Sequence, residues 1–385
     1  MQIRVEHIRH MTTFFIFVLV ILLWDSAAPV ESAALPEGRA RARDIGIQIG
    51  IYEPGAYNAI TDVPGVKVGH TTLNYGDDVR TGVTAVIPRD DIWEYRLFGA
   101  AYVINGNGEA TGISWVNEAG WIESPIMLTN TLSVGAVHDG VVRYMVKRYP
   151  KSHIILPIVA ECYDGGLNDI SGLHVTAENA IEAIENATTG PVPEGCVGTG
   201  TGMRCYQFKA GVGTASRVLP ADDGGYTVGV LVNANGGRRH QLRIDGVPVG
   251  TEITDLKPEW GRDGSFVIVI ATNAPLLHRQ LLQLAKRATH GLARTGTPST
   301  VSSGEFVIAF STANPIPKRS EEATMSIAML RNGWMDALYQ AVIEATEESV
   351  INAMTTATTT IGRNGNMIHA IPLDRLQAIM KKYGR

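Results

Sequence analysis

The chain has 385 residues, of which 45% are apolar, and this is ample for a large hydrophobic core. Its formal net charge is −5 and no long basic run occurs, so the composition argues against nucleic acid as a partner. Length alone permits one to three domains. No Pro/Ser-rich linker and no block of like charges interrupts the chain, so we predict one domain over residues 35–385.

The N-terminal segment has the pattern of an export signal. Two arginines precede an unbroken apolar run of eleven residues, 14–24, which suits the core of a signal peptide and is too short to span a bilayer. Small residues follow, and cleavage after Ala28 or Ala34 fits them. We therefore predict a signal peptide over residues 1–34, a secreted or periplasmic protein, and no membrane association after signal removal. The alternative is an uncleaved membrane anchor.

Six short apolar runs predict β-strands, and four segments with apolar residues at helical spacing predict helices. The strand segments are residues 83–87, 101–104, 154–160, 226–233, 266–272 and 306–312. The helical segments are residues 139–148, 177–186, 275–292 and 326–357. From residue 265 onward the order is strand, helix, strand, helix, which permits a layered α/β or α+β domain.

Small polar residues stand where two of the predicted strands begin. Ser265 directly precedes the fifth strand segment, while Ser303 and Glu305 precede the sixth. Residues two apart on an extended backbone point to the same face, so both Ser303 and Glu305 are expected to reach Ser265. A serine hydroxyl supported by a second serine and a carboxylate can form a nucleophile with its network. The plainer alternative is a turn at Asp263 and Gly264 followed by an ordinary serine.

Two further polar side chains follow predicted strands. Asn235 lies just beyond residues 226–233, where a side-chain amide can donate to the oxyanion that develops in acyl transfer. Glu161 directly follows residues 154–160, and a carboxylate at the end of a buried strand is more often a site residue than a surface glutamate is. For Asn235 the alternative is that Asn-Gly simply starts a turn.

The three cysteines leave their redox state open. In an oxidising compartment Cys196 and Cys205 are the pair that a disulfide would join, with Cys162 left over. The alternative is three reduced, buried thiols, because a free cysteine commonly behaves as a small hydrophobe.

The motifs present do not indicate a metal or a cofactor. No His-Glu-x-x-His or Cys-x-x-Cys motif occurs, and we expect His70 and His138 to be structural. The glycine-rich stretch 198–202 lacks the Gly-Lys-Ser/Thr ending of a phosphate-binding loop, so we interpret it as a turn-rich loop.

Nine short segments occur along the chain in the order found in one known family. Together they resemble the L-aminopeptidase/D-esterase and β-aminopeptidase family over about residues 45–375. No single segment is specific, but the ordered set is. The segments are residues 58–70, 105–112, 123–132, 161–169, 198–203, 230–239, 263–272, 291–296 and 303–305.

The resemblance implies a precursor that cuts itself between Gly264 and Ser265, giving an α chain of residues 35–264 and a β chain of residues 265–385. Ser265 is then both the new N-terminus and the nucleophile. A freed α-amine titrates near ~8 and lies within reach of its own hydroxyl, so it can serve as the base. Carried over to this sequence, the other site residues are Ser303 and Glu305, which assist Ser265, Asn235, which donates to the oxyanion, Tyr163, which lines the site, and Glu161, which holds the substrate amine.

The same resemblance implies a four-layer αββα sandwich, similar to N-terminal-nucleophile hydrolases and ornithine acetyltransferase, and a homo-oligomer of α/β pairs. It implies release of N-terminal residues from short peptides, amides or esters, including D- or β-amino acid substrates, through an acyl-enzyme on Ser265. Two departures from the family pattern, Val232 in place of glutamine and Cys162 in place of threonine, bear on substrate preference. The alternatives are an acyltransferase or an ester or amide hydrolase on the same scaffold, and an exported peptide-binding protein that never cleaves itself.

Overall fold

The computed structural model describes residues 33–258 and 264–385. Ser32–Arg385 forms one compact unit. The predicted signal peptide lies outside the described residues except for its last two positions, and so does Asp263 of the predicted turn. Within the described ranges, no helix combines the length and the apolar character needed to cross a bilayer.

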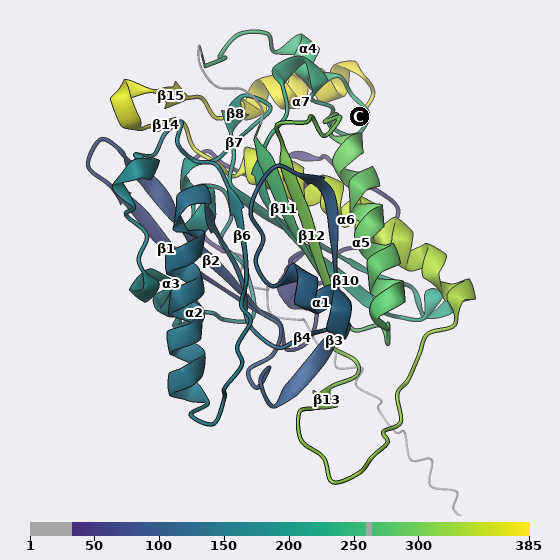
Figure 1. The fold of residues 1–385 in the computed structure, drawn as a ribbon. Helices are drawn as coiled ribbons and strands as arrows, with labels where there is room; N and C mark the ends of the chain where they lie inside the picture. Colours follow the sequence, from purple (N-terminus) through teal and green to yellow (C-terminus); the bar gives the residue numbers. More distant parts are fainter. Residues whose placement is uncertain (1–32, 259–263) are drawn as a thin grey trace, which may run out of the picture. The chain divides into compact units, whose positions relative to one another are not determined.

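Two β-sheets form the centre of the fold (Figure 1). Their strands are β1 (Lys67–Tyr75), β2 (Val79–Ile87), β3 (Tyr95–Gly106), β4 (Trp121–Ile122), β5 (Ile126–Asn130), β6 (Ile158–Cys162), β9 (Val212–Val218), β10 (Thr227–Asn235), β11 (Ser265–Thr272), β12 (Gly304–Ser311) and β13 (Ile316–Pro317). The larger sheet has the order β13-β3-β12-β11-β10-β9, with β4 on β3, and the smaller has the order β1-β2-β5-β6. In these sheets β11 pairs parallel with β12 and β5 pairs parallel with β6, while the other neighbours are antiparallel.

Helices cover the outer face of each sheet. The smaller sheet is covered by α2 (Val134–Arg148) and α3 (Ala177–Glu185), and the larger by α5 (His278–Arg294) and α6 (Met335–Thr355) (Figure 1). One apolar core fills each of the three spaces between layers. This arrangement confirms the predicted αββα sandwich. The shorter elements are α1 (Ile113–Ala119), α4 (Val249–Glu252), α7 (Leu373–Lys382), and the two-residue strand pairs β7 (Arg204–Cys205) with β8 (Phe208–Lys209) and β14 (Thr360–Ile361) with β15 (Met367–Ile368).

The central strand β11 contributes to two cores at once. Phe266 and Ile268 belong to the core beneath α5 and α6, whereas Val267 and Val269 belong to the core between the sheets. Successive side chains of a strand point to opposite faces, which accounts for this division. The same alternation places Ser265 on the face that looks towards the smaller sheet.

All six predicted strand segments overlap observed strands, but the third begins later than expected. Residues 154–157 lie outside the strand, which starts at Ile158 opposite Ile126 of β5. Pro157 has no N–H to contribute to a ladder, and the Ile154 side chain is 68% exposed. The strands β1, β5 and β9 were not predicted.

The predicted helix over residues 326–357 is wrong in its first third, because α6 begins only at Met335. The preceding segment is irregular, and two of its backbone N–H groups donate hydrogen bonds to residues outside the segment. The Ala328 N–H donates to the side chain of Asn314, and the Leu330 N–H donates to the Pro275 carbonyl. The other three predicted helices match α2, α3 and α5 apart from their ends.

Three smaller predictions also have outcomes. All three cysteines are free thiols, so the structure holds no disulfide between Cys196 and Cys205. The glycine-rich stretch Gly198–Gly202 forms a buried 3₁₀ turn packed on β1 and β2. His70 lies on β1 with Nδ1 2.9 Å from the Thr84 hydroxyl, and burial lowers its pKa to about 4, so the ring is neutral near pH 7.

Candidate active site

Three neighbouring strands of the larger sheet bring the predicted catalytic residues together. Asn235 at the end of β10 is the register partner of Ser265 at the start of β11. On the other side, β12 runs parallel to β11, and its Gly304 N–H donates to Ser265 Oγ at 3.4 Å. Ser265, Ser303, Glu305 and Asn235 are all buried. Residues from three separate stretches of sequence thus meet at one end of the sheet.

Ser303 contacts the carbonyl group that precedes Ser265. Its Oγ lies 2.5 Å from the Gly264 carbonyl oxygen and 2.8 Å from Glu305 Oε1. A serine hydroxyl carries one proton and can donate to only one of these oxygens at a time. Both bonds form together only when Glu305 is protonated and donates to Ser303. In the structure Ser303 thus reaches the Gly264 carbonyl next to Ser265, and Glu305 reaches Ser303.

Glu305 is a buried carboxyl that has no cation beside it in the part of the chain that the structure describes. Its side chain makes no ion pair with any described residue, and Oε2 has no hydrogen-bond partner. Burial raises the pKa of Glu305 above its ordinary value, and the hydroxyls of Ser303 and Ser299 offset this only in part. The protonated form that the hydrogen-bond chain requires is thus favoured by the surroundings.

The Asn235 amide is held in a single orientation. The Arg204 N–H donates to Oδ1 at 3.1 Å, and Nδ2 donates to the Tyr163 carbonyl at 2.8 Å. One backbone donor and one backbone acceptor decide which end of the amide carries the nitrogen. The second hydrogen of Nδ2 is left to serve as a donor beside Gly264 and Ser265.

Position 264 has no room for a side chain, so it requires glycine. A Cβ atom at this position would lie 1.7 Å from the Asn235 carbonyl oxygen and 2.9 Å from Asn235 Nδ2. These atoms belong to the neighbouring strand and cannot move aside without breaking its pairing with β11. Only glycine brings the 264–265 peptide this close to Asn235.

The predicted substrate-binding residues come from the smaller sheet. Glu161 lies at the end of β6, where Oε1 accepts from the Glu109 N–H at 3.2 Å and Oε2 accepts from the Thr131 hydroxyl. Burial raises the pKa of Glu161, and these two bonds only partly offset the effect. Tyr163 is 55% exposed, and its backbone carbonyl accepts from Asn235 Nδ2.

A loop after β3 links Glu161 to the catalytic strands. A Cβ on Gly108 would meet Glu161 Oε1 at 2.6 Å and Gly304 Cα at 3.5 Å, so both groups touch this glycine. Asn105 near the end of β3 donates through Nδ2 to the Ser303 carbonyl, and Asn107 on the loop donates to the Ser302 carbonyl at 2.8 Å. The sequence analysis did not predict that this loop contacts the catalytic strands. The Asn-Gly-Asn-Gly stretch at residues 105–108 was its one visible signal.

The family is decided by comparison with known proteins. The sequence model of peptidase family S58 matches residues 58–368. The chain belongs to this family. Family S58 thus accounts for the ordered segments found in the sequence, and it identifies the chain as a serine aminopeptidase.

Individual known proteins resemble the chain in sequence and in structure. A β-peptidyl aminopeptidase from Sphingosinicella microcystinivorans is 43% identical over 379 residues, covering 92% of this chain and 95% of the relative. A β-aminopeptidase from Burkholderia sp. has a TM-score of 0.86 at 44% identity and covers 90% of this chain and 99% of its own. The L-aminopeptidase D-Ala-esterase/amidase from Ochrobactrum anthropi, described as a variant of the Ntn hydrolase fold, has a TM-score of 0.84 at 40% identity with the same coverage.

Proposed function

We propose that the chain cleaves its own Gly264–Ser265 bond and that Ser265 then acts as the N-terminal nucleophile of an aminopeptidase. The observation that carries this proposal is the position of the Gly264 carbonyl. It lies next to the Ser265 hydroxyl in sequence, its oxygen accepts from Ser303, and a side chain at residue 264 is excluded by Asn235.

The proposed cleavage begins with attack of Ser265 Oγ on the Gly264 carbonyl carbon. The C–N bond breaks, the serine proton passes to the departing nitrogen, and an ester remains on Ser265. Water then hydrolyses the ester to give a carboxylate on Gly264 and a free amine on Ser265. Negative charge develops on the Gly264 oxygen during the attack, so the hydrogen bond from Ser303 stabilises the transition state more than the ground state.

In the cleaved enzyme we assign each polar group a role in acyl transfer. The Ser265 amine, with a pKa near ~8, takes the proton of its own hydroxyl as that hydroxyl attacks the substrate. The free hydrogen of Asn235 Nδ2 donates to the oxyanion. Ser303 and Glu305 hold the nucleophile's surroundings in place. Glu161 binds the substrate ammonium, because an arriving cation compensates a carboxylate that is buried without one.

The substrate class follows from the names of the relatives. They are a β-peptidyl aminopeptidase, a β-aminopeptidase and an L-aminopeptidase D-Ala-esterase/amidase. We therefore propose short peptides, amides and esters with a free N-terminal amine, including β- and D-residues. Export by the N-terminal signal and assembly into an oligomer of α/β pairs belong to the same proposal.

The deciding experiment compares the intact masses of purified wild type, Ser265→Ala and Ser320→Ala. The whole chain has a mass of 41.5 kDa over 385 residues, so residues 35–264 correspond to roughly 25 kDa and residues 265–385 to roughly 13 kDa. We expect wild type and the exposed control Ser320→Ala to give these two fragments and Ser265→Ala to stay whole. An uncut wild type, or cleavage of Ser265→Ala at the same bond, would rule the mechanism out. β-Alanine and D-alanine anilides then test the substrate class.

A further inference from the structure

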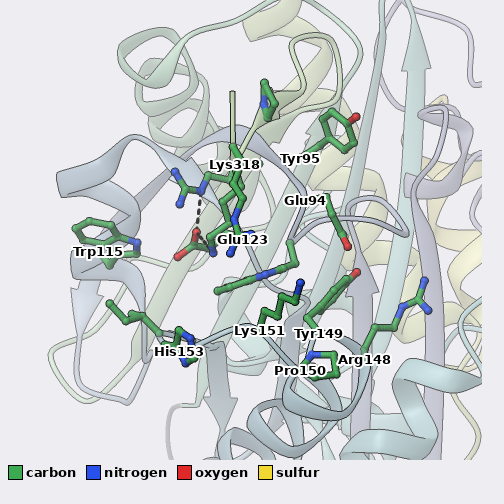
Figure 2. Close-up of a pocket in the computed structure, with 15 residues that line it drawn as sticks. Glu94, Tyr95, Trp115, Glu123, Arg148, Tyr149, Pro150, Lys151, His153 and Lys318 are labelled. Atoms are coloured by element: carbon green, nitrogen blue, oxygen red, sulfur yellow. Dashed lines mark hydrogen bonds and ion pairs between the residues drawn. The ribbon is translucent and has the colours of Figure 1, made fainter. Parts of the chain in front are cut away.

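A cavity lies at the opposite end of the larger sheet from Ser265. It has a volume of about 800 Å³, within the range of small-molecule sites, and Figure 2 shows the residues that line it. Tyr95 and Arg96 at the start of β3 contribute to its wall, whereas Gly106 at the end of β3 pairs with Gly304 beside the catalytic residues. Ten residues of strand separate the two ends, which is roughly 33 Å. The cavity is therefore separate from the aminopeptidase site.

One residue in the cavity wall is a buried carboxylate, Glu123, which is paired with two cations. Glu123 is buried, with Oε2 2.8 Å from Arg96 Nε and 3.5 Å from Lys318 Nζ (Figure 2). The Arg96 guanidinium also lies 4.7 Å from the centre of the Trp121 ring, which keeps it in place. Two cations thus satisfy the one buried acid, and the other basic residues of the cavity are not needed for this purpose.

The cavity concentrates positive charge on a protein that is acidic as a whole. Its lining contains five Lys or Arg residues and two Glu residues, a formal surplus of +3, while the whole chain carries −5. Arg148, Lys151 and Arg319 are exposed at the cavity, and no ion pair with a described residue engages them. A hollow with a surplus of one sign of charge attracts the opposite charge.

Flat apolar surfaces stand beside these cations. The Trp115 ring is 37% exposed and the Tyr95 ring 41% exposed, and Trp93 stacks on Tyr149 with ring centroids 6.2 Å apart. Ile154 adds an aliphatic side chain that is mostly exposed. Exposed aromatic rings next to guanidinium and ammonium groups suit a ligand with a planar apolar body and an anionic group.

We propose that this cavity, bounded by β3, the segment after α2 and the segment at Lys318, is a binding site for a small aromatic or amphiphilic anion. The carboxylate or sulfonate group of the ligand pairs with Arg148, Lys151 and Arg319, and its flat body lies against Trp115 and Tyr95. The site has no part in the peptidase chemistry, and its occupancy does not depend on cleavage at Ser265.

The test uses 8-anilinonaphthalene-1-sulfonate as the anionic probe and N-phenyl-1-naphthylamine as its uncharged counterpart. Fluorescence titration of the intact protein gives both dissociation constants. We expect the sulfonate to bind at least tenfold more tightly than the neutral amine. Lys151→Glu/Arg319→Glu should weaken sulfonate binding at least tenfold. The control Lys257→Glu/Lys381→Glu makes the same change of charge on exposed residues outside the cavity and should alter it less than twofold.

Each other result overturns the proposal. Absence of sulfonate binding to wild type means that no such site is accessible. Equal affinity for the two probes excludes an anion site. Equal weakening of sulfonate binding by both double variants means that the dye binds elsewhere or that its binding depends only on the net charge of the protein. Self-cleavage and aminopeptidase activity, measured on the same samples, report that the variants are folded and should remain unchanged.

Discussion

Two buried polar clusters in this molecule differ in whether their carboxyl groups are paired with cations. The first, which we call the charge network, joins Arg217 on β9 to Glu344 and Glu348 on α6 at 3.1 Å and 2.7 Å, and Arg43 adds a second cation to Glu348. The second is the catalytic cluster of Ser265, Ser303, Glu305 and Asn235. In the charge network each buried charge faces its opposite, whereas the catalytic cluster buries Glu305 with no cation among the described residues.

The contrast extends to the buried carboxyl groups of the whole described chain. Glu123, Glu194, Glu344, Glu347 and Glu348 each pair with Arg or Lys. Glu161, Asp164 and Glu305 are also buried but pair with no described cation, and all three lie at or beside the proposed site. Burial raises the pKa of Asp164 to about 7. Unpaired burial of a carboxyl is costly and therefore marks function here, while paired burial marks structure.

The largest expected effect is on stability, from Arg217→Ala. It leaves Glu344 and Glu348 with a missing partner in a water-free region, which costs roughly 3–5 kcal/mol of unfolding free energy. Arg143→Ala is the matched control, because its pairs with Asp139 and Glu178 are exposed and screened by water, so a much smaller loss of stability is expected. Urea unfolding in an uncleaved Ser265→Ala background measures both. Equal losses for the two variants would remove the distinction between the clusters.

The next effect is on rate, from Ser303→Ala. Loss of a donor to the developing charge on the Gly264 oxygen should slow self-cleavage by roughly 10²–10³-fold. The time course of fragment appearance after cell-free synthesis measures this rate, with Ser320→Ala as the control. Because the variant removes only a hydroxyl, its unfolding free energy should change by about 1 kcal/mol. A normal cleavage rate would show that the bond from Ser303 is only structural.

The smallest effect is a change of pH dependence, from Glu305→Gln. Burial raises the pKa of Glu305, so its protonated form is complete below the ordinary glutamate pKa and is lost as pH rises through the folded value. Above that value Glu305 takes the Ser303 proton away from the Gly264 oxygen. A glutamine amide can donate to Ser303 Oγ at every pH, so the ratio of variant to wild-type self-cleavage rate should rise with pH. A constant ratio over pH 4–9 would mean that Glu305 does not control the Ser303 proton.

Some parts of this site were open to prediction from the sequence because they depend on local properties. Ser265 and Ser303 stand before strongly apolar runs and Asn235 stands after one, and such runs become buried strands wherever they pair. The contacts among them were not open to the same reasoning. That Ser303 bonds the carbonyl of Gly264 depends on the parallel register of β11 and β12, and on the change of register between Glu305 and Phe306 opposite β3.

Other parts escaped prediction because tertiary contacts overrode the local pattern. Residues 326–334 have apolar spacing that favours a helix, yet hydrogen bonds to Asn314 and Pro275 hold the backbone in an irregular conformation. The cavity lined by Tyr95, Lys151 and Lys318 had no signal in the sequence, since these residues lie in unrelated stretches of the chain.

The amino-acid sequence by itself determined the apolar strands, most of the helices, the family and the identities of the polar residues at the strand ends. Periodicity and composition act over a few residues, so they are present in the chain before it folds. Only the tertiary structure decided that Asn235 leaves no room for a side chain at Gly264, that Glu305 has no cation beside it among the described residues, and that an anion-attracting cavity forms far from Ser265. Those properties depend on which distant segments become neighbours, and strand register and layer packing establish this only in the folded state.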